Sequence, residues 1–266
     1  MAMIVMTVRL TSGLYHFQFV HLQGQENFSI ASYVEGPALT ATFSPIDSNY
    51  VAFCSKGQLF VDRQNVKLFE SPSLPNITNG VASFIAQEEF ERFEGFWWNP
   101  KNLEILYERV DESPVAQLAF TLPGSIVNLG NQQSDESQFM RYPLAGTSNP
   151  PTTLRICQIN EQNGSVMDLE LKVDLKIVFP WCEYIARCGW SNDGQNIYIL
   201  AMDRVQSRMA LALVPRSVFA EESVFVPNAD QLVTVLYEEK ALYWINVISF
   251  LMGIFSNSDM KNIVIF

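Results

Sequence analysis

The sequence predicts an all-β protein, and three observations lead to this prediction. Short apolar runs rich in Val, Ile, Phe and Tyr are broken by Gly, Pro, Asn and Asp throughout the 266 residues. Long stretches of helical periodicity are scarce. One phrase also recurs: an aromatic residue, a polar turn, an alternating strand, a second polar turn and a second strand. This recurrence favours a β-propeller, in which each repeat is one blade.

The repeated phrase begins at Phe43, Trp98 and Trp190, with the copies FSPIDSNYVAFCSKGQLFV, WNPKNLEILYERVDESPVAQLAF and WSNDGQNIYILAMDRVQSRMALALV. We interpret each copy as a hairpin whose first strand starts with an aromatic residue packed between neighbouring blades. The second interval is about twice the ~40–50 residues of one blade, so we expect one further blade between Trp98 and Trp190. A β-sandwich is the alternative fold, because it also gives short strands at such spacing.

The charge balance excludes one class of partner and favours another. The chain carries 28 acidic against 17 basic residues, a formal net charge of −11. Such a charge repels a phosphate backbone, so we expect no nucleic acid partner. A negative field instead favours cationic ligands, such as the free amino terminus of a peptide.

The cysteines indicate a reducing compartment. Cys54, Cys157, Cys182 and Cys188 form neither a CxxC pair nor a dense framework, so we expect reduced thiols, no metal site and no cofactor. The first positive charge, Arg9, follows the apolar residues of MAMIVMTVRL, which is not the order of a secretory signal peptide. Taking Met1 as the start, we expect a cytoplasmic protein.

Four segments resemble the propeller of the dipeptidyl peptidase IV family, in the prolyl oligopeptidase superfamily, and most closely its cytosolic eight and nine branch. They are GVASFIAQEEFERFEGFWWNP (80–100), ILYERVDESPV (105–115), RYPLAGTSNPPTTLRICQI (141–159) and EYIARCGWSNDGQNIYILAMDRVQSRMALALV (183–214). They occur in the order and with roughly the spacing of the family. The resemblance implies that residues 1–247 form an incomplete propeller of about four to five blades, the N-terminal region of such a peptidase.

The resemblance also assigns a binding site. Glu88 and Glu89 match the glutamate pair that, in this family, binds the α-ammonium of the substrate peptide. An ammonium offers three donors and one charge, and two carboxylates supply charge-assisted acceptors. The segment QEEFERFEGF permits a short helical turn with Phe90 and Phe93 on its inner side. The alternative is a solvated acidic turn in which Glu88 and Arg92 form an ordinary i, i+4 pair.

Two other features of the resemblance concern assembly and the core. Residues 159–181 fall where family members extend an arm that helps to form a homodimer, although the alternation of Leu169, Leu171 and Val173 equally suits an internal strand. Aromatic and Met residues of the matching segments are expected in the core rather than at a cofactor, namely Trp97, Trp98, Trp190 and Met202.

The catalytic residues of such a peptidase are not found in these 266 residues. There is no GxSxG nucleophile elbow, and the only histidines are His16 and His21, so the order Ser, Asp, His cannot be built. We therefore expect no α/β-hydrolase domain, no catalytic residue and no peptide hydrolysis by this chain alone. The resemblance implies a full-length parent that removes N-terminal Xaa-Pro or Xaa-Ala dipeptides. The alternative function is a non-catalytic propeller that binds or regulates an intact peptidase.

The likeness ends near Val247, and residues 248–266 are expected to be a divergent hydrophobic tail. We interpret this tail as a truncated splice form, translated intron or gene-model error. A tail anchor built from ALYWINVISFLMGIF is the competing hypothesis. Its ~15 apolar residues fall short of the ~20 that span a bilayer, so membrane anchoring is not expected.

Overall fold

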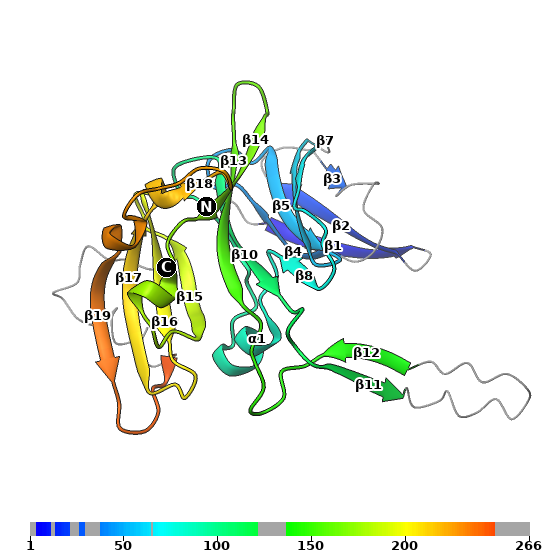
Figure 1. The fold of residues 1–266 in the computed structure, drawn as a ribbon. Coiled ribbons are helices and arrows are strands. Elements are labelled where there is room, and N and C mark those ends of the chain that lie inside the picture. Colours follow the sequence, from blue (N-terminus) through cyan, green and yellow to red (C-terminus); the bar gives the residue numbers. More distant parts are fainter. Residues whose placement is uncertain are drawn as a thin grey trace, which may run out of the picture.

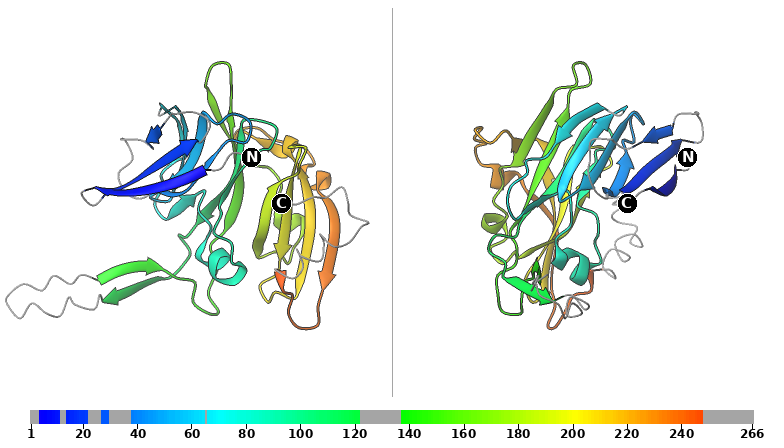
Figure 2. Two further views of the ribbon diagram at one scale, coloured as in Figure 1. Left: turned by 180° about the vertical axis from the view of Figure 1, so that it is seen from behind. Right: turned by 90° about the vertical axis from the view of Figure 1, so that its right-hand side faces the viewer.

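The computed structural model describes residues 4–11, 14–21, 27–29, 38–64, 66–121 and 137–247; the tail after Val247 lies outside these residues. The described chain consists mostly of strands, arranged as separate antiparallel sheets that fan out beside one another (Figures 1 and 2). This architecture confirms the all-β prediction and fits a partial propeller.

The first two sheets form the amino-terminal side of the fan. One contains β1 (Ile4–Thr11), β2 (Leu14–His21) and β3 (Asn27–Ser29). The other contains β4 (Ala38–Phe43), β5 (Tyr50–Ser55), β6 (Gln58–Arg63) and β7 (Val66–Glu70). In the second sheet, β5 pairs with β6 as the repeated phrase predicts.

The third and fourth sheets hold most of the remaining chain. The third contains β8 (Ile77–Asn79), β9 (Phe96–Trp98), β10 (Glu104–Asp111), β13 (Thr152–Ile159), β14 (Val166–Leu171) and β18 (Phe219–Ala220). Its strand order is β18-β14-β13-β10-β8, and β9 also pairs with β10. The fourth contains β15 (Tyr184–Trp190), β16 (Asn196–Met202), β17 (Arg208–Pro215) and β19 (Thr234–Lys240). Short helical segments lie between strands: α1 (Phe84–Phe90) between two strands of the third sheet, and α2 (Leu175–Val178), η1 (Arg216–Val218) and η2 (Ala229–Leu232) where the chain passes between the third and fourth sheets.

The expectation of a further blade between Trp98 and Trp190 is wrong. Strands β10, β13 and β14 belong to the same sheet as β8 and β9, and β15 starts the next one. The extra length lies in a hairpin, β11 (Gln117–Thr121) and β12 (Ser137–Arg141), which forms a two-stranded sheet of its own and projects from the body (Figure 1). The run VAQLAF, expected to pair with β10, instead contributes to β11, which pairs with β12. Strand β10 pairs with β13, β8 and β9.

The aromatic residue of each phrase ends a strand instead of starting one. Phe43, Trp98 and Trp190 are the last residues of β4, β9 and β15, and the polar turn follows. The expected packing between blades is confirmed. The Trp98 indole N–H donates to the carbonyl of Thr42 (3.1 Å), and that of Trp190 donates to the carbonyl of Trp97 (3.0 Å). Each indole thus donates to a backbone carbonyl of the preceding blade. In both cases this carbonyl belongs to the residue just before the aromatic residue of that blade's phrase.

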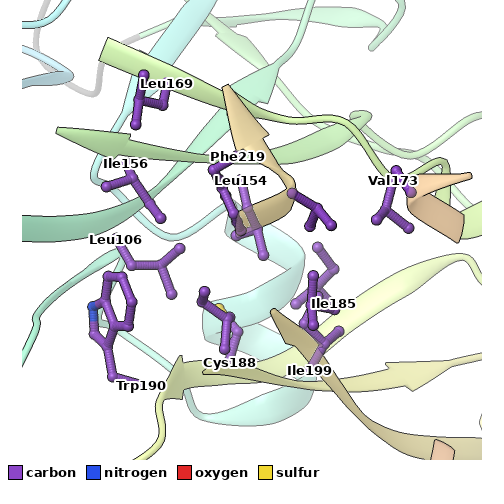
Figure 3. Close-up of a cluster of buried hydrophobic side chains, with 14 residues drawn as sticks. Leu106, Leu154, Ile156, Leu169, Val173, Ile185, Cys188, Trp190, Ile199 and Phe219 are labelled. Carbon is purple, nitrogen blue, oxygen red and sulfur yellow. The ribbon is translucent and has the colours of Figure 1, made fainter. Parts of the chain in front are cut away.

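The core lies between the sheets. Leu106, Leu154 and Ile156 of the third sheet face Cys188 and other residues of the fourth (Figure 3). A second cluster joins the second sheet to the third, and includes Tyr50, Leu59, Ile105, Tyr107 and Cys157. Burial of such side chains stabilises the fold by about 1.5–3 kcal/mol each, so the second, third and fourth sheets depend on one another. Trp190 and Met202 are buried, as predicted, while Trp97 and Trp98 are partly buried against these clusters.

Residues 159–181 contain an internal strand. Within them, β14 pairs with both β13 and β18, and Leu169 and Val173 are buried in the cluster of Figure 3, with Leu171 packed against it. Of the two interpretations of this alternation, the internal blade strand is the one that the structure shows. The turn between β13 and β14 projects at one end of the fan (Figure 1).

Candidate functional site

The helix that carries Glu88 and Glu89 is short and fixed at both ends. Ser83 caps α1, because its hydroxyl oxygen accepts a hydrogen bond from the Ala86 backbone N–H (3.2 Å). At the other end, Phe90 is buried against Ala186, Leu200 and other residues of the fourth sheet. Its ring meets that of Tyr184 edge-on, with centroids 5.3 Å apart.

The helix ends sooner than the sequence suggested. Glu91 adopts a left-handed conformation (φ 49°), and the Arg92 N–H returns to the Ala86 carbonyl (3.0 Å). The i, i+3 relationship between Phe90 and Phe93 therefore does not apply. Phe93 is 67% exposed, so the prediction that both rings lie on the inner side is correct for Phe90 and wrong for Phe93.

Arg92 does not pair with Glu88, which corrects the alternative interpretation of this segment. Its guanidinium forms two hydrogen bonds to the buried Glu108 carboxylate of β10, at 2.9 and 2.7 Å. It also donates to the Ala186 and Ile185 carbonyls of β15, each at 3.2 Å. Burial by itself lowers the pKa of Arg92, but the Glu108 carboxylate raises it above its ordinary value. Burial raises the pKa of Glu108, and the Arg92 guanidinium opposes this by lowering it.

This arrangement fixes the end of α1 between two blades. Arg92 joins it to the third and fourth sheets, and the Arg187 guanidinium of β15 donates to the Phe90 carbonyl (2.5 Å). Figure 1 shows α1 lying between these sheets. A seven-residue helix is marginal by itself, so its position depends on these tertiary contacts.

Glu88 and Glu89 lie in the last turn of this helix, and both are exposed. Glu89 accepts a hydrogen bond from the Gln206 side-chain amide (2.9 Å), and Gln206 in turn accepts one from the Trp244 indole (2.8 Å). The sequence singled out the two glutamates as candidates, but it gave no sign of their contacts with Gln206 and Trp244 or of the Arg92–Glu108 pair. Gln206 lies 117 residues from Glu89, and no local pattern relates the two.

The site offers fixed negative charge and is suited to a cation with several hydrogen-bond donors. Two neighbouring carboxylates on a fixed turn can accept charge-assisted hydrogen bonds from an ammonium group. Within the described residues, no group of three His, Cys, Asp or Glu side chains is arranged to hold a metal ion. We therefore name no metal ligand at this site.

The four cysteines are free and buried, whereas a reactive thiol is partly exposed and has a lowered pKa. Burial raises the pKa of Cys54 to about 12 and that of Cys182 to about 11. Burial also raises the pKa of Cys157 and Cys188 well above the ordinary value. These thiols stay protonated at neutral pH and act as small apolar core residues.

Comparison with known proteins places the chain in a family. The family model for the dipeptidyl peptidase IV (DPP IV) N-terminal region matches residues 12–264. The chain belongs to this family. The match confirms the resemblance of the four segments, and it extends past Val247.

Individual relatives agree with this placement. Dipeptidyl peptidase 8 from Homo sapiens is 31% identical over 237 residues, which cover 76% of this chain and 25% of the relative. Venom dipeptidyl peptidase 4 from Apis mellifera is 23% identical, over 71% of this chain and 22% of its own length. The chain thus spans about a quarter of the curated relatives that it matches.

A solved structure shows the same fold. The crystal structure of Porphyromonas gingivalis dipeptidyl peptidase 4 superposes with a TM-score of 0.65 at 17% identity, covering 91% of this chain and 32% of that one. Among the residues that the structure describes, no helix is long and apolar enough to cross a membrane.

Proposed function

We propose that this chain supplies the substrate-amine site of a serine-type dipeptidyl peptidase, with Glu88 and Glu89 as the residues that bind the peptide's free amino terminus. The parent enzyme would remove N-terminal Xaa-Pro or Xaa-Ala dipeptides. The observation that carries the proposal is the position of the two carboxylates: exposed, consecutive and on a turn that Phe90 and Arg92 fix between two blades. Membership in the family supports it.

The proposed chemistry follows from the charge and donor count of the ligand. An α-ammonium carries one positive charge and three N–H donors, whereas an acetylated amino terminus has no charge and a single donor. Two carboxylates therefore favour the free amine strongly over the blocked one. By holding the amino terminus of the peptide at a fixed place, the site would determine which peptide bond is cut, as a dipeptidase requires.

The catalytic serine, aspartate and histidine are assigned to none of these 266 residues. In this proposal the chain binds substrate and does not hydrolyse it. We place the protein in the cytoplasm, which agrees with four free, buried thiols.

The direct test is calorimetric titration of the chain with a proline-containing peptide that has a free amino terminus, and with its N-acetylated twin. The proposal expects measurable binding of the free peptide and none of the acetylated peptide at the same concentration. Equal affinity for the two peptides would show that the site does not recognise an ammonium group.

We propose a non-catalytic interaction role as the second candidate, with homodimerisation through residues 159–181. Only part of this range is available to a partner, because Leu169 and Val173 are buried. The turn between β13 and β14 projects from the fan (Figure 1). Near this turn, the Met167 side chain of β14 is 45% exposed. Met167→Glu should shift a dimer toward monomer in sedimentation velocity; an unchanged sedimentation coefficient contradicts this contact.

A further inference from the structure

We propose that Gln206 is a positioning residue of the amine site, which holds the Glu89 carboxylate in place and is itself oriented by Trp244. The inference rests on the proposed function, since it specifies how the amine-binding carboxylate is held. Gln206 lies in the turn between β16 and β17, on the fourth sheet, and reaches α1 from there.

The orientation of the Gln206 amide follows from the chemistry of its two partners. An indole N–H can only donate, so the amide oxygen must face Trp244, at 2.8 Å. The amide nitrogen then faces the Glu89 carboxylate, at 2.9 Å, where it donates to Oε2. Trp244 therefore prevents the amide from turning its oxygen toward the carboxylate, where it would repel.

The backbone of Gln206 supports a role for its side chain. Gln206 has a φ of 57°, in the left-handed region that Gly and Asn occupy more readily. Its N–H donates to the Asp203 carbonyl (3.1 Å), and its own carbonyl accepts from the Ile245 N–H (2.8 Å). A glutamine in a strained turn with both amide ends in use indicates that the side chain serves a purpose.

Gln206 is the buried member of this arrangement, whereas Glu89 and Trp244 are exposed. Gln206 is 9% exposed, and Ile245, next to Trp244, is buried in the same cluster as Phe90. The segment that supplies Trp244 and the helix that supplies Glu89 thus pack on one face of the fourth sheet. With one carboxylate oxygen held by Gln206, Glu89 needs no reordering when an ammonium arrives, which strengthens binding.

The first measurement needs no peptide. In the 15N-labelled chain, the indole N–H resonance of Trp244 is assigned by its loss in Trp244→Phe. Glu89→Gln should move this resonance through Gln206, whereas Glu88→Gln should leave it in place. An unmoved resonance in Glu89→Gln overturns the inference, because the connection would then be absent in solution.

The second measurement uses the free-amine peptide and its N-acetylated twin. Gln206→Met, which has a similar length and no hydrogen-bonding amide, should weaken binding of the free peptide roughly tenfold. Trp244→Phe should weaken it less and in the same direction, because the amide is kept but loses its orienting donor. Gln195→Met, at an exposed glutamine in another turn of the same sheet, is the matched control and should bind as the wild type does.

A double-mutant cycle separates positioning from a general structural effect. If Gln206 acts through Glu89, Gln206→Met should have little effect in a Glu89→Gln background. An effect of the same size in both backgrounds overturns the inference. If the wild type itself fails to distinguish the two peptides, the proposed function fails and the positioning role with it. If it distinguishes them and Gln206→Met does so equally well, only the inference about Gln206 fails.

Discussion

Arg92 and Glu108 form a buried ion pair with two hydrogen bonds, at 2.9 and 2.7 Å, although 16 residues separate them in the sequence. The pair lies where α1, β10 and β15 meet, and the guanidinium also binds two carbonyls of β15. It connects the turn that bears Glu88 and Glu89 to two blades at once. The position of the proposed amine site therefore depends on the packing of both blades.

Removing one partner of this pair should be costly. Arg92→Met leaves the Glu108 carboxylate buried without a counter-charge, and we expect a loss of about 3–5 kcal/mol in the free energy of unfolding. Urea denaturation measures it. Lys67→Met, which breaks the exposed Lys67–Glu70 pair, should lose less than about 1 kcal/mol. Equal losses in the two variants would contradict the role of the Arg92–Glu108 pair.

The two phenylalanines of the α1 segment should differ sharply. Phe90→Ala removes a ring that is 2% exposed and should destabilise the chain by about 3–5 kcal/mol. Phe93→Ala removes a ring that is 67% exposed and should change stability by about 0.5 kcal/mol or less. Thermal unfolding of the two variants compares them directly. Similar melting temperatures would contradict the burial of Phe90 against the fourth sheet.

Gly194 should tolerate no side chain. A Cβ there would collide with Oδ1 of Asn99. The Asn99 side chain cannot easily move away, because it is fully buried and its Nδ2 donates to the Gly194 carbonyl (3.0 Å). Gly194→Ala should therefore destabilise the chain by more than about 2 kcal/mol. Gly146→Ala is the matched control, since Gly146 also has a positive φ but has open space around it. This variant should lose only the cost of backbone strain, about 1 kcal/mol. Equal losses in a urea titration would remove the steric argument.

The buried thiols should make the fold sensitive to alkali. Their pKa values are raised by burial in the folded chain, to about 12 for Cys54 and about 11 for Cys182, while an unfolded cysteine titrates near 8.5. Above that pH the unfolded chain binds fewer protons than the folded one, so stability falls as pH rises. Below it, the stabilisation is fully present.

Urea titrations at pH 7.5 and 9.5, with reductant, measure this effect. We expect a loss of roughly 1 kcal/mol per buried thiol over the interval. Cys54→Ala should lower stability at both pH values but reduce the difference between them. The same difference in Cys54→Ala and the wild type would show that this thiol does not contribute.

The sequence contained enough to predict the fold class and a short helical turn at Glu88 and Glu89, but not the geometry around these residues. The phrase at Trp190 gave two paired strands, β16 and β17, because its alternation and turns are local. The phrase at Trp98 gave a wrong pairing, because its second strand, β11, belongs to the projecting hairpin although its composition resembles that of a blade strand. Hydrophobic periodicity cannot say which strand pairs with which.

The same limit applies to the site. Helical spacing grouped Phe90 with Phe93 and Glu88 with Arg92, but the left-handed residue Glu91 ends the helix and breaks both relationships. The contacts that position the carboxylates come from other blades. Such partners emerge only when the sheets are packed.

The measurement that tests the central claim most directly is calorimetric titration of a free-amine peptide into Glu88→Gln, Glu89→Gln and Glu91→Gln. Each variant removes one negative charge from the same exposed turn, so the long-range field changes equally. The account predicts at least roughly tenfold weaker binding for Glu88→Gln and Glu89→Gln, and wild-type affinity for Glu91→Gln. The same affinity in all three variants would contradict it.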